Sequence, residues 1–337
     1  MPDRVYFEPD ALKYELGERL RGEFAARGIP IFMTTSHNRV TKIPGDTRRE
    51  AFFAAKRTLV IGVRRSKDFQ TSKPSADYAL PLVTGCPGHC QYCYLNTSLG
   101  NKPYVRIYVN VNEILARADR YIEKNAPKET VFDGSCTSDP VVVEPWSGAL
   151  RTCIEHFAQT RYGRFRFVTK YDAVDGLLDA DHRGRTEIRF SINSEYVIKN
   201  FEKAVASLER RLNAARKVAE AGYPLGFLIG PIMEYEGWQA GYTKMLNDLA
   251  ERLSGISPTS LTFELVTHRF TPKAKRIINE VYPQNRLPMD EQNRQWKWGQ
   301  FGYGKYLYPK DTFEELRDFF YRRIPAFFPQ AHILYMV

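Results

Sequence analysis

The chain has 337 residues, of which 43% are hydrophobic and 26% charged, so its composition is that of an ordinary soluble enzyme with a sizeable core in one domain or two. No apolar run approaches the length of a membrane span, which argues against a membrane protein, and five cysteines, an odd number, argue against a disulfide framework. Lysine and arginine exceed aspartate and glutamate by 49 to 39, and this excess, with 20 tyrosines and 21 phenylalanines, weakly favours a nucleic-acid partner.

The first part of the chain is predicted to combine two helices with two strands. A helix is expected at about 11–27, followed by an irregular segment. A second helix at 50–56 precedes an apolar strand at 58–65. Another apolar strand at 79–85 leads directly into a loop that contains three of the cysteines.

This loop carries the most specific signal in the sequence. Cys86, Cys90 and Cys93 fall within eight residues, with the spacing C-x3-C-x2-C. Thiolates hold iron–sulfur clusters, and a cube of four irons with only three local cysteines leaves one iron open to bind a small molecule. Structural zinc needs a fourth ligand, and His89, between two of the cysteines, is badly placed to be one. Zinc and three packed core cysteines remain the weaker alternatives.

After the loop, predicted strands and amphipathic helices alternate, and Cys153 lies on the apolar side of one such helix, where we expect core packing. The strands are expected at 104–111, 129–135, 164–170, 186–193, 224–231 and 261–270, and the helices at about 112–124, 149–160, 207–222, 237–253 and 272–281. Near-continuously apolar strands that alternate with helices indicate a parallel sheet covered by helices. We predict an α/β fold with a partial (βα)6 barrel of the TIM type, and a doubly wound open sheet is the rival.

Polar or special residues collect where these strands end. In barrels of this kind the reactive groups lie at the carboxyl ends of the strands. The residues at those positions are Cys86, Cys136, Lys170, Ser191, Asn193, Glu195, Gly230, His268 and Arg269. The sequence therefore predicts a site at this edge of the sheet.

The segment 295–311 alternates aromatic and basic residues and contains three glycines. It predicts a β-hairpin that turns near 302–304, a candidate contact with nucleic acid. An amphipathic hairpin that merely packs on the barrel is the alternative. A helix at 312–328 and a strand at 331–337 complete the chain.

The cysteine spacing, at the end of the first barrel strand, resembles the signature of the radical S-adenosylmethionine superfamily. Within that superfamily nearly the whole chain resembles the spore photoproduct lyases. The resemblance rests on TSKPSA at 71–76, TGCPGHCQYCYLNTSLGNKPY at 84–104, CTSD at 136–139, FVTKY at 167–171, RFSINS at 189–194, HRF at 268–270 and GKYLY at 304–308.

The resemblance implies a DNA repair lyase that reverses spore photoproduct, 5-thyminyl-5,6-dihydrothymine, to two thymines. It implies a 4Fe-4S cluster on Cys86, Cys90 and Cys93, with S-adenosylmethionine on the fourth iron. The reduced cluster cleaves the cofactor, and the 5′-deoxyadenosyl radical then removes hydrogen from C6 of the lesion, after which the linking C–C bond breaks.

The same resemblance implies roles for other residues. Cys136 would return a hydrogen atom to the thymine radical, and Tyr94, with Tyr92, would then reduce the resulting thiyl radical. A buried core cysteine is the alternative for Cys136, and Tyr92 is equally well explained by packing against the cluster or adenine. The implied cofactor-binding set is Ser138, Lys170, Ser191, Asn193 and Tyr92.

The implied substrate is double-stranded DNA that carries a thymine dimer, with the lesion taken out of the stack. Gly230 would let the backbone approach the lesion, and the hairpin at 296–308 would engage the opened duplex with Lys305 and Tyr308 facing DNA. Gln300 and Phe301 stand where the family commonly has an Arg–Tyr pair, so one phosphate contact is lost. His268 and Arg269 would contact substrate or phosphate, or equally form salt bridges at the barrel rim.

The resemblance also sets an expected organisation. Residues 1–78 would form an N-terminal segment packed on the barrel, 79–285 the partial barrel, and 286–337 the DNA-contacting hairpin, helix and strand. We expect a cytoplasmic monomer of the spore or germinating cell, without a membrane partner and with an unidentified electron donor. The alternatives are a radical enzyme that modifies RNA or another nucleic acid, and a metal-stabilised nucleic-acid-binding module without turnover.

Overall fold

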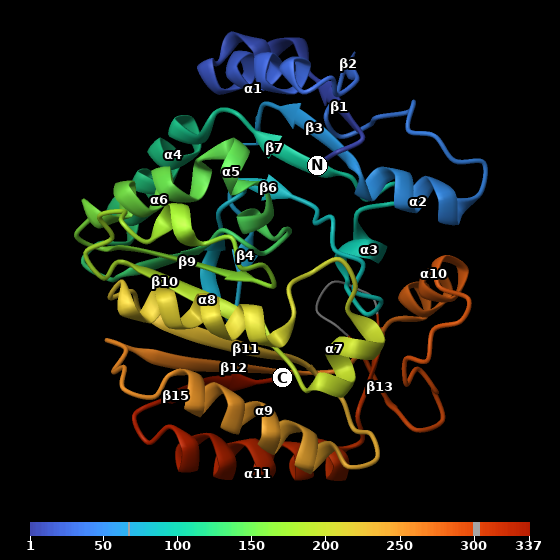
Figure 1. Cartoon of the computed structure of the whole chain (residues 1–337), viewed down its shortest axis with the longest axis vertical. Coiled ribbons are helices and arrows are strands. Elements are labelled where there is room, and N and C mark those ends of the chain that lie inside the picture. Colours follow the sequence, from blue (N-terminus) through green and yellow to red (C-terminus); the bar gives the residue numbers. More distant parts are fainter. Residues whose placement is uncertain (67, 299–303) are drawn as a thin grey trace. The chain divides into compact units, whose positions relative to one another are not determined.

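The computed structural model describes residues 1–66, 68–298 and 304–337 (Figure 1). The chain divides into two compact units. Unit 1 comprises Met1–Pro87 and Ser98–Glu187, and unit 2 comprises Gly88–Thr97 and Ile188–Val337. The chain passes from one unit to the other inside the cysteine loop. Cys86 therefore belongs to unit 1, whereas Cys90 and Cys93 belong to unit 2. The functional boundaries expected at 78/79 and 285/286 remain predictions.

Unit 1 contains a five-stranded sheet in the order β2-β1-β3-β7-β6. Its strands are β1 (Arg4–Phe7), β2 (Ile31–Met33), β3 (Thr58–Gly62), β6 (Val83–Thr84) and β7 (Val105–Tyr108), and β6 alone runs antiparallel to its neighbour. Helices α1 (Glu15–Ala26) and α2 (Arg48–Lys56) belong to the same part of the chain, and the short β1 and β2 were not predicted. The expected first helix is divided into a 3-10 turn at Pro9–Lys13 and α1.

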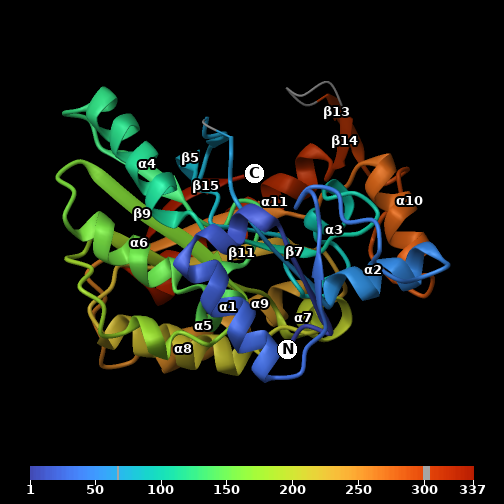
Figure 2. The same cartoon turned by 90° about the horizontal axis from the view of Figure 1, so that it is seen from above.

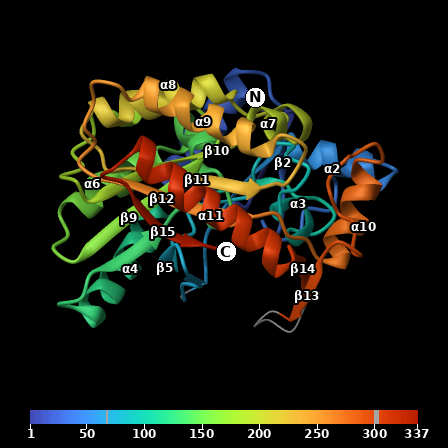
Figure 3. The same cartoon turned by 90° about the horizontal axis from the view of Figure 1, so that it is seen from below.

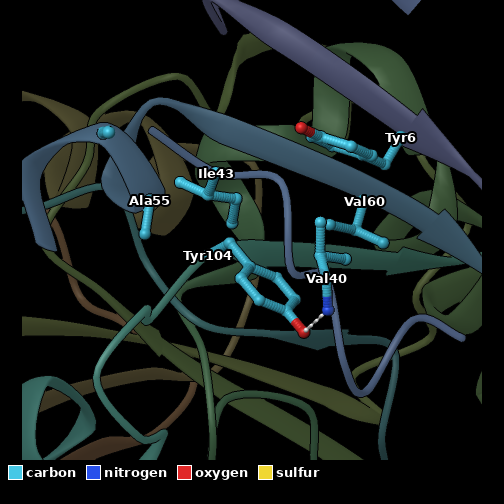
Figure 4. Close-up of a cluster of buried hydrophobic side chains, with 7 residues drawn as sticks. Tyr6, Val40, Ile43, Ala55, Val60 and Tyr104 are labelled. Atoms are coloured by element: carbon cyan, nitrogen blue, oxygen red, sulfur yellow. Dashed lines mark hydrogen bonds between the residues drawn. The ribbon is translucent and has the colours of Figure 1, made fainter. Parts of the chain in front are cut away.

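Helix α2 is fixed at its start and along its buried side. Thr47 Oγ1 accepts from Glu50 N, and the Glu50 carboxylate accepts from Thr47 N, which together form a capping box. The buried side of α2 belongs to an apolar cluster (Figure 4), here called the α2 cluster. Its members are Tyr6, Val40, Ile43, Ala54, Ala55, Val60 and Tyr104. This packing places the C-terminal residue of the helix, Lys56, against the rest of unit 1.

The remaining strands of unit 1 are β4 (Thr71–Ser72), β5 (Ala76–Ala79), β8 (Thr130–Asp133) and β9 (Gly163–Thr169). Strands β5, β8 and β9 pair in parallel, and β4 is antiparallel to β5. Helices α4 (Val111–Asn125), α5 (Glu144–Ser147) and α6 (Ala149–Ala158) follow β7 and β8, and α3 (Leu95–Ser98) ends the cysteine loop.

Two details of the expected barrel were wrong. The strand expected at 79–85 is two strands, β5 and β6, in different sheets, because Pro81 between them has no N–H to continue a ladder. The strand expected at 104–111 is β7, which pairs with β3 instead of with β8 (Figure 1). An apolar strand followed by a helix does not by itself reveal which sheet the strand joins.

Unit 2 contains the parallel strands β10 (Thr186–Ile192, of which the first two residues lie in unit 1), β11 (Leu225–Ile232), β12 (Leu261–Thr267) and β15 (His332–Met336). Its helices are α7 (Glu195–Phe201), α8 (Leu208–Glu220), α9 (Trp238–Arg252), α10 (Pro272–Val281) and α11 (Lys310–Phe327). Helices α9 and α11 lie side by side (Figure 3). Between them, Trp238 packs edge-on against Phe319.

The predicted hairpin is present as β13 (Gln295–Trp298) and β14 (Gly304–Leu307), which pair antiparallel. Figure 2 shows it near α10. Its turn, with Gln300 and Phe301, lies outside the described residues. None of the described helices has both the length and the apolar character that a membrane span requires.

Candidate active site

The chain enters the cysteine loop through a position that only glycine fits. Gly85 has φ +86°, and a Cβ there would lie 2.5 Å from the carbonyl oxygen of Tyr104. The Gly85 N–H donates to Thr137 O at 2.7 Å, and Gly85 forms a parallel bridge with Ser138. Within unit 1 this pairing brings the backbone of Cys86 next to the segment that follows β8.

Cys86 itself is half-buried between two polar groups of unit 1. Its Sγ lies 3.7 Å from the hydroxyl of Tyr171, and its carbonyl oxygen accepts a hydrogen bond of 2.7 Å from Lys56 Nζ. Neither neighbour was predicted, because Lys56 comes from a helix 30 residues earlier and Tyr171 from a loop 85 residues later.

The thiol of Cys136 lies just beyond the end of β8, where the sequence predicted it. It is half-buried, and its Sγ is 2.5 Å from Ser72 Oγ in β4. Ser72 lies in the segment 71–76, and no site role was predicted for it. The contact arises because β4 folds back along β5, which in turn pairs with β8.

Asp139 connects the segment after β8 to the end of β9. Its Oδ1 accepts from Thr169 Oγ1 and its Oδ2 from the Lys170 N–H, both at 2.7 Å. Burial raises the pKa of this carboxyl group to about 6, even though both hydrogen bonds lower it. Asp139 thus fixes the backbone of Lys170, and its place in the CTSD motif was the only sequence signal for this role.

Asp139→Asn should change how stability depends on pH. The pKa of Asp139 is raised from 3.8 to about 6, so its contribution to stability is present at low pH and is lost as pH rises through about 6. At ~1.4 kcal/mol per unit, ionising the buried group costs about 3 kcal/mol. Urea unfolding measured between about pH 4 and 7 should show that the free energy of unfolding of the wild type falls by this amount relative to that of Asp139→Asn. The same pH dependence of the free energy of unfolding in both proteins would contradict the raised pKa.

Ser138 and Lys170 are the predicted cofactor-binding residues that lie in unit 1. Ser138 is buried, and its hydroxyl makes a long hydrogen bond of 3.5 Å to Gly134 O. Lys170 is half-buried directly after β9. Both follow the carboxyl ends of parallel strands, as expected, and their role in binding remains a prediction.

In unit 2 the cysteine loop is fastened to the end of α7. His89 N donates to Lys203 O at 2.8 Å and Gln91 N donates to Phe201 O at 2.9 Å. Cys90 is buried, and its carbonyl oxygen accepts from Asn96 Nδ2 at 2.8 Å, whereas Cys93 is half-buried. The loop conformation is therefore set by neighbouring backbone as well as by its own turns.

Tyr92 anchors the same loop through a buried ion pair. Its hydroxyl donates to Glu202 Oε1, and Glu202 Oε2 accepts from Arg211 Nη2 at 2.5 Å. Arg211, wholly buried, also donates to Ser191 O at 3.0 Å. Burial and the Glu202 carboxylate hold the pKa of the Tyr92 phenol well above its usual value. Glu202 and Arg211 were not predicted, because in the sequence they look like ordinary surface charges of a helical segment.

Two more predicted cofactor residues, Ser191 and Asn193, lie in and after β10. Ser191 is buried. The amide of Asn193 is engaged within the protein, since Nδ2 donates to Pro231 O at 2.8 Å and Oδ1 accepts from Ser194 N at 2.9 Å. Asn193 therefore ties β10 to β11, and this structure gives it a positioning role.

Cys153 and Tyr94 differ in how far each is buried. All five cysteines lie within the described residues as reduced thiols. Cys153 is fully buried in α6, and burial raises the pKa of its thiol, as expected for a core residue. Tyr94 exposes 59% of its surface, so its environment contrasts with that of Tyr92.

Comparison with known proteins gives the same family for the whole chain. The sequence profile described as "Spore photoproduct lyase" matches residues 1–337. Curated spore photoproduct lyases of Geobacillus sp. and Bacillus subtilis are each 51% identical over 335 residues, which cover 99% of this chain and 98% of theirs. A solved spore photoproduct lyase in complex with dinucleoside spore photoproduct matches with a TM-score of 0.98 and 52% identity, covering 100% of this chain and 99% of that one.

The chain belongs to the spore photoproduct lyase family. A second solved structure, a double variant with bound S-adenosylmethionine and dinucleoside spore photoproduct, also matches with a TM-score of 0.98, 52% identity and coverage of 100% of this chain and 99% of that one. These matches confirm the predicted α/β fold class and the resemblance on which the sequence analysis relied.

The three thiols of this spore photoproduct lyase family member are donors of the kind that hold an iron–sulfur cluster. Among the described residues, no group of three or more His, Cys, Asp or Glu side chains is arranged to hold one ion. In a cube, each thiolate ligates its own iron, so three cysteines need not converge on one point. Three reduced thiols on one short loop meet that requirement.

Two of the residues predicted to contact DNA, His268 and Tyr308, are buried in the structure. His268 is 2% exposed, and burial together with the Arg294 guanidinium lowers its pKa to about 3, so it is a neutral imidazole at physiological pH. Tyr308 is 7% exposed, lies under the Arg294 guanidinium, and accepts from Glu234 N at 3.0 Å. Tyr308 is therefore largely covered by neighbouring groups in this structure, and its contact with DNA remains a prediction.

Lys305 and Gly230, two other residues predicted to contact the DNA or the lesion, have different surroundings. Lys305 is half-buried on β14, and burial, with Arg269 and Lys297 nearby, lowers the pKa of its ammonium. Such a group of cations suits a polyanion. At Gly230 a Cβ would lie 2.7 Å from Leu228 Cδ2, so the side chain of Leu228 occupies the room that glycine leaves.

Proposed function

We propose that this protein repairs DNA by converting spore photoproduct into two thymines through radical carbon–carbon bond cleavage. Family membership over the full chain supports the proposal, as do related structures solved with dinucleoside spore photoproduct and with S-adenosylmethionine. The observation that carries it is a fourth thiol, Cys136, positioned beyond β8 and outside the three-cysteine loop. A cluster alone needs only the loop, whereas a lyase must also return hydrogen to its product.

The proposed cofactors are a 4Fe-4S cluster on Cys86, Cys90 and Cys93 and S-adenosylmethionine. When bound, they supply a radical that removes hydrogen from C6 of the lesion. The chain's part is to bind and orient: Lys170, whose backbone Asp139 fixes, can pair with a carboxylate, and the hydroxyls of Ser138 and Ser191 can bind polar groups of the cofactor.

We propose that Cys136 completes the reaction. Its S–H bond breaks as a C–H bond forms on the thymine methylene radical, which leaves a thiyl radical on Sγ. Ser72 Oγ, 2.5 Å from Sγ, helps to hold the Cys136 side chain in place, whichever of the two groups donates the hydrogen bond. A hydrogen atom from the phenol of Tyr94, with Tyr92, then restores the thiol, and the delocalised phenoxyl radical left behind would take a hydrogen atom in turn from 5′-deoxyadenosine.

The proposed substrate is double-stranded DNA. Enzymes that act on a base must take it out of the stack, and the hairpin β13–β14 offers exposed Trp298 and Lys297 for that contact. Trp298 exposes 70% of its surface, which is unusual for so large an apolar side chain.

The test is anaerobic incubation of the reconstituted protein with dinucleotide spore photoproduct, dithionite and S-adenosylmethionine. We expect the lesion to be converted to thymidylyl-thymidine. Liquid chromatography with mass spectrometry measures this conversion. Cys93→Ala should abolish conversion, whereas the matched control Cys153→Ala, which removes a buried cysteine of α6, should retain it. Wild-type protein that binds the cluster and cleaves the cofactor without consuming the lesion would refute the proposed substrate.

A further inference from the structure

Lys56 is a buried cation close to the cysteine loop. The residue is only 3% exposed, and its Nζ donates to the carbonyl oxygen of Cys86 at 2.7 Å. The ammonium also lies over the ring of Phe52, whose centroid is 5.4 Å from Nζ. Among the residues the structure describes, no carboxylate forms an ion pair with it.

Burying an ammonium group in this way is unfavourable in free energy. Removing a charge from water costs several kcal/mol, and such charges are normally paired or placed next to a metal centre. A hydrogen bond to one backbone carbonyl and a contact with an aromatic ring offset only part of that desolvation free energy. The charge is therefore either a source of instability or the counterpart of a negative group that occupies this part of the protein.

The position of Lys56 is also fixed. It is the last residue of α2, and Ala54 and Ala55 before it belong to the α2 cluster (Figure 4). The capping box holds the other end of the helix. Because the helix cannot move without breaking this packing, the ammonium is directed at the backbone of Cys86 by the fold.

We infer that Lys56 is the counter-charge of the iron–sulfur cluster and that it raises the cluster's reduction potential. The inference rests on the proposed function, which places the cluster on Cys86. A cluster held by thiolates is anionic, and its potential depends on the net charge, hydrogen bonds and exposure around it. A fixed positive charge beside it favours the state with one more electron. A residue outside the cysteine motif thus makes the reduced state easier to reach.

The test compares three substitutions in the reconstituted full-length protein. Lys56→Arg keeps the charge, Lys56→Gln keeps a hydrogen-bond donor without the charge, and Lys56→Met keeps neither. The control Lys13→Met removes the same charge from an exposed side chain of unit 1. The midpoint potential of the cluster is measured by redox titration with electron paramagnetic resonance, and iron content checks that each variant holds its cluster.

We expect Lys56→Gln and Lys56→Met to lower the equilibrium constant for reduction about tenfold, a shift of about 59 mV to more negative potential for one electron. Lys56→Arg and Lys13→Met should match the wild type. If Lys56→Gln also matches the wild type, the ammonium acts as a hydrogen-bond donor and the inference is wrong. If wild-type protein never binds a cluster, both the inference and the proposed cofactor fail, whereas equal potentials in all variants overturn only the inference.

Discussion

Replacing Cys136 with alanine is expected to separate cleavage of the cofactor from formation of two thymines. The substitution leaves the three-cysteine loop untouched, so S-adenosylmethionine should still be cleaved when the lesion is present. The thymine radical then has no S–H bond within reach, and we expect it to be quenched by other reactants. Mass spectrometry should show that intact repair product falls by about an order of magnitude or more, with adducts of the reductant in its place.

Ser72→Ala provides the matched control. It removes the hydroxyl 2.5 Å from Cys136 Sγ but keeps the thiol, so the product should remain clean while the thiol is less well oriented. Cofactor cleavage should be similar in both variants. Clean formation of two thymines by Cys136→Ala would remove this residue from the reaction, and loss of cofactor cleavage would instead give it a part in an earlier step.

The sequence predicts the parts of this site that local patterns encode. The spacing of Cys86, Cys90 and Cys93 and the placement of Cys136 and Lys170 after strands are local features, and the structure has them where they were expected. Strand type was also predictable because buried parallel strands are continuously apolar.

Contacts between distant segments could not be predicted in this way. Ser72 meets Cys136, and Lys56 meets Cys86, through strand pairing and helix packing that leave no local pattern. For the same reason the sequence did not show that β7 joins the sheet of β3. Tyr308 gives a further example: the sequence pattern placed it in the hairpin segment but did not show that the Arg294 guanidinium covers its ring.

Glu202→Gln is expected to be among the most destabilising single substitutions in unit 2. Glu202 and Arg211 are both fully buried at their side chains, and the substitution leaves the guanidinium charge without its carboxylate. Breaking one partner of a buried ion pair typically costs about 3–5 kcal/mol, because the remaining charge stays out of water. Urea unfolding followed by circular dichroism should therefore show a lower midpoint with little change in slope.

Tyr92→Phe separates the contribution of the Tyr92–Glu202 hydrogen bond to stability from that of the Glu202–Arg211 ion pair. This variant removes the phenol that donates to Glu202 but leaves the carboxylate with Arg211, so it should cost about 1.5–3 kcal/mol at most, the range for a hydrogen bond to a charged group. Replacing both charges, as in Glu202→Gln with Arg211→Met, should cost less than the sum of the two single changes, since no buried charge is left behind. Additive costs would mean that Arg211 is stabilised chiefly by its backbone acceptors, Ala206 O and Ser191 O, and that the cysteine loop is anchored without help from the ion pair.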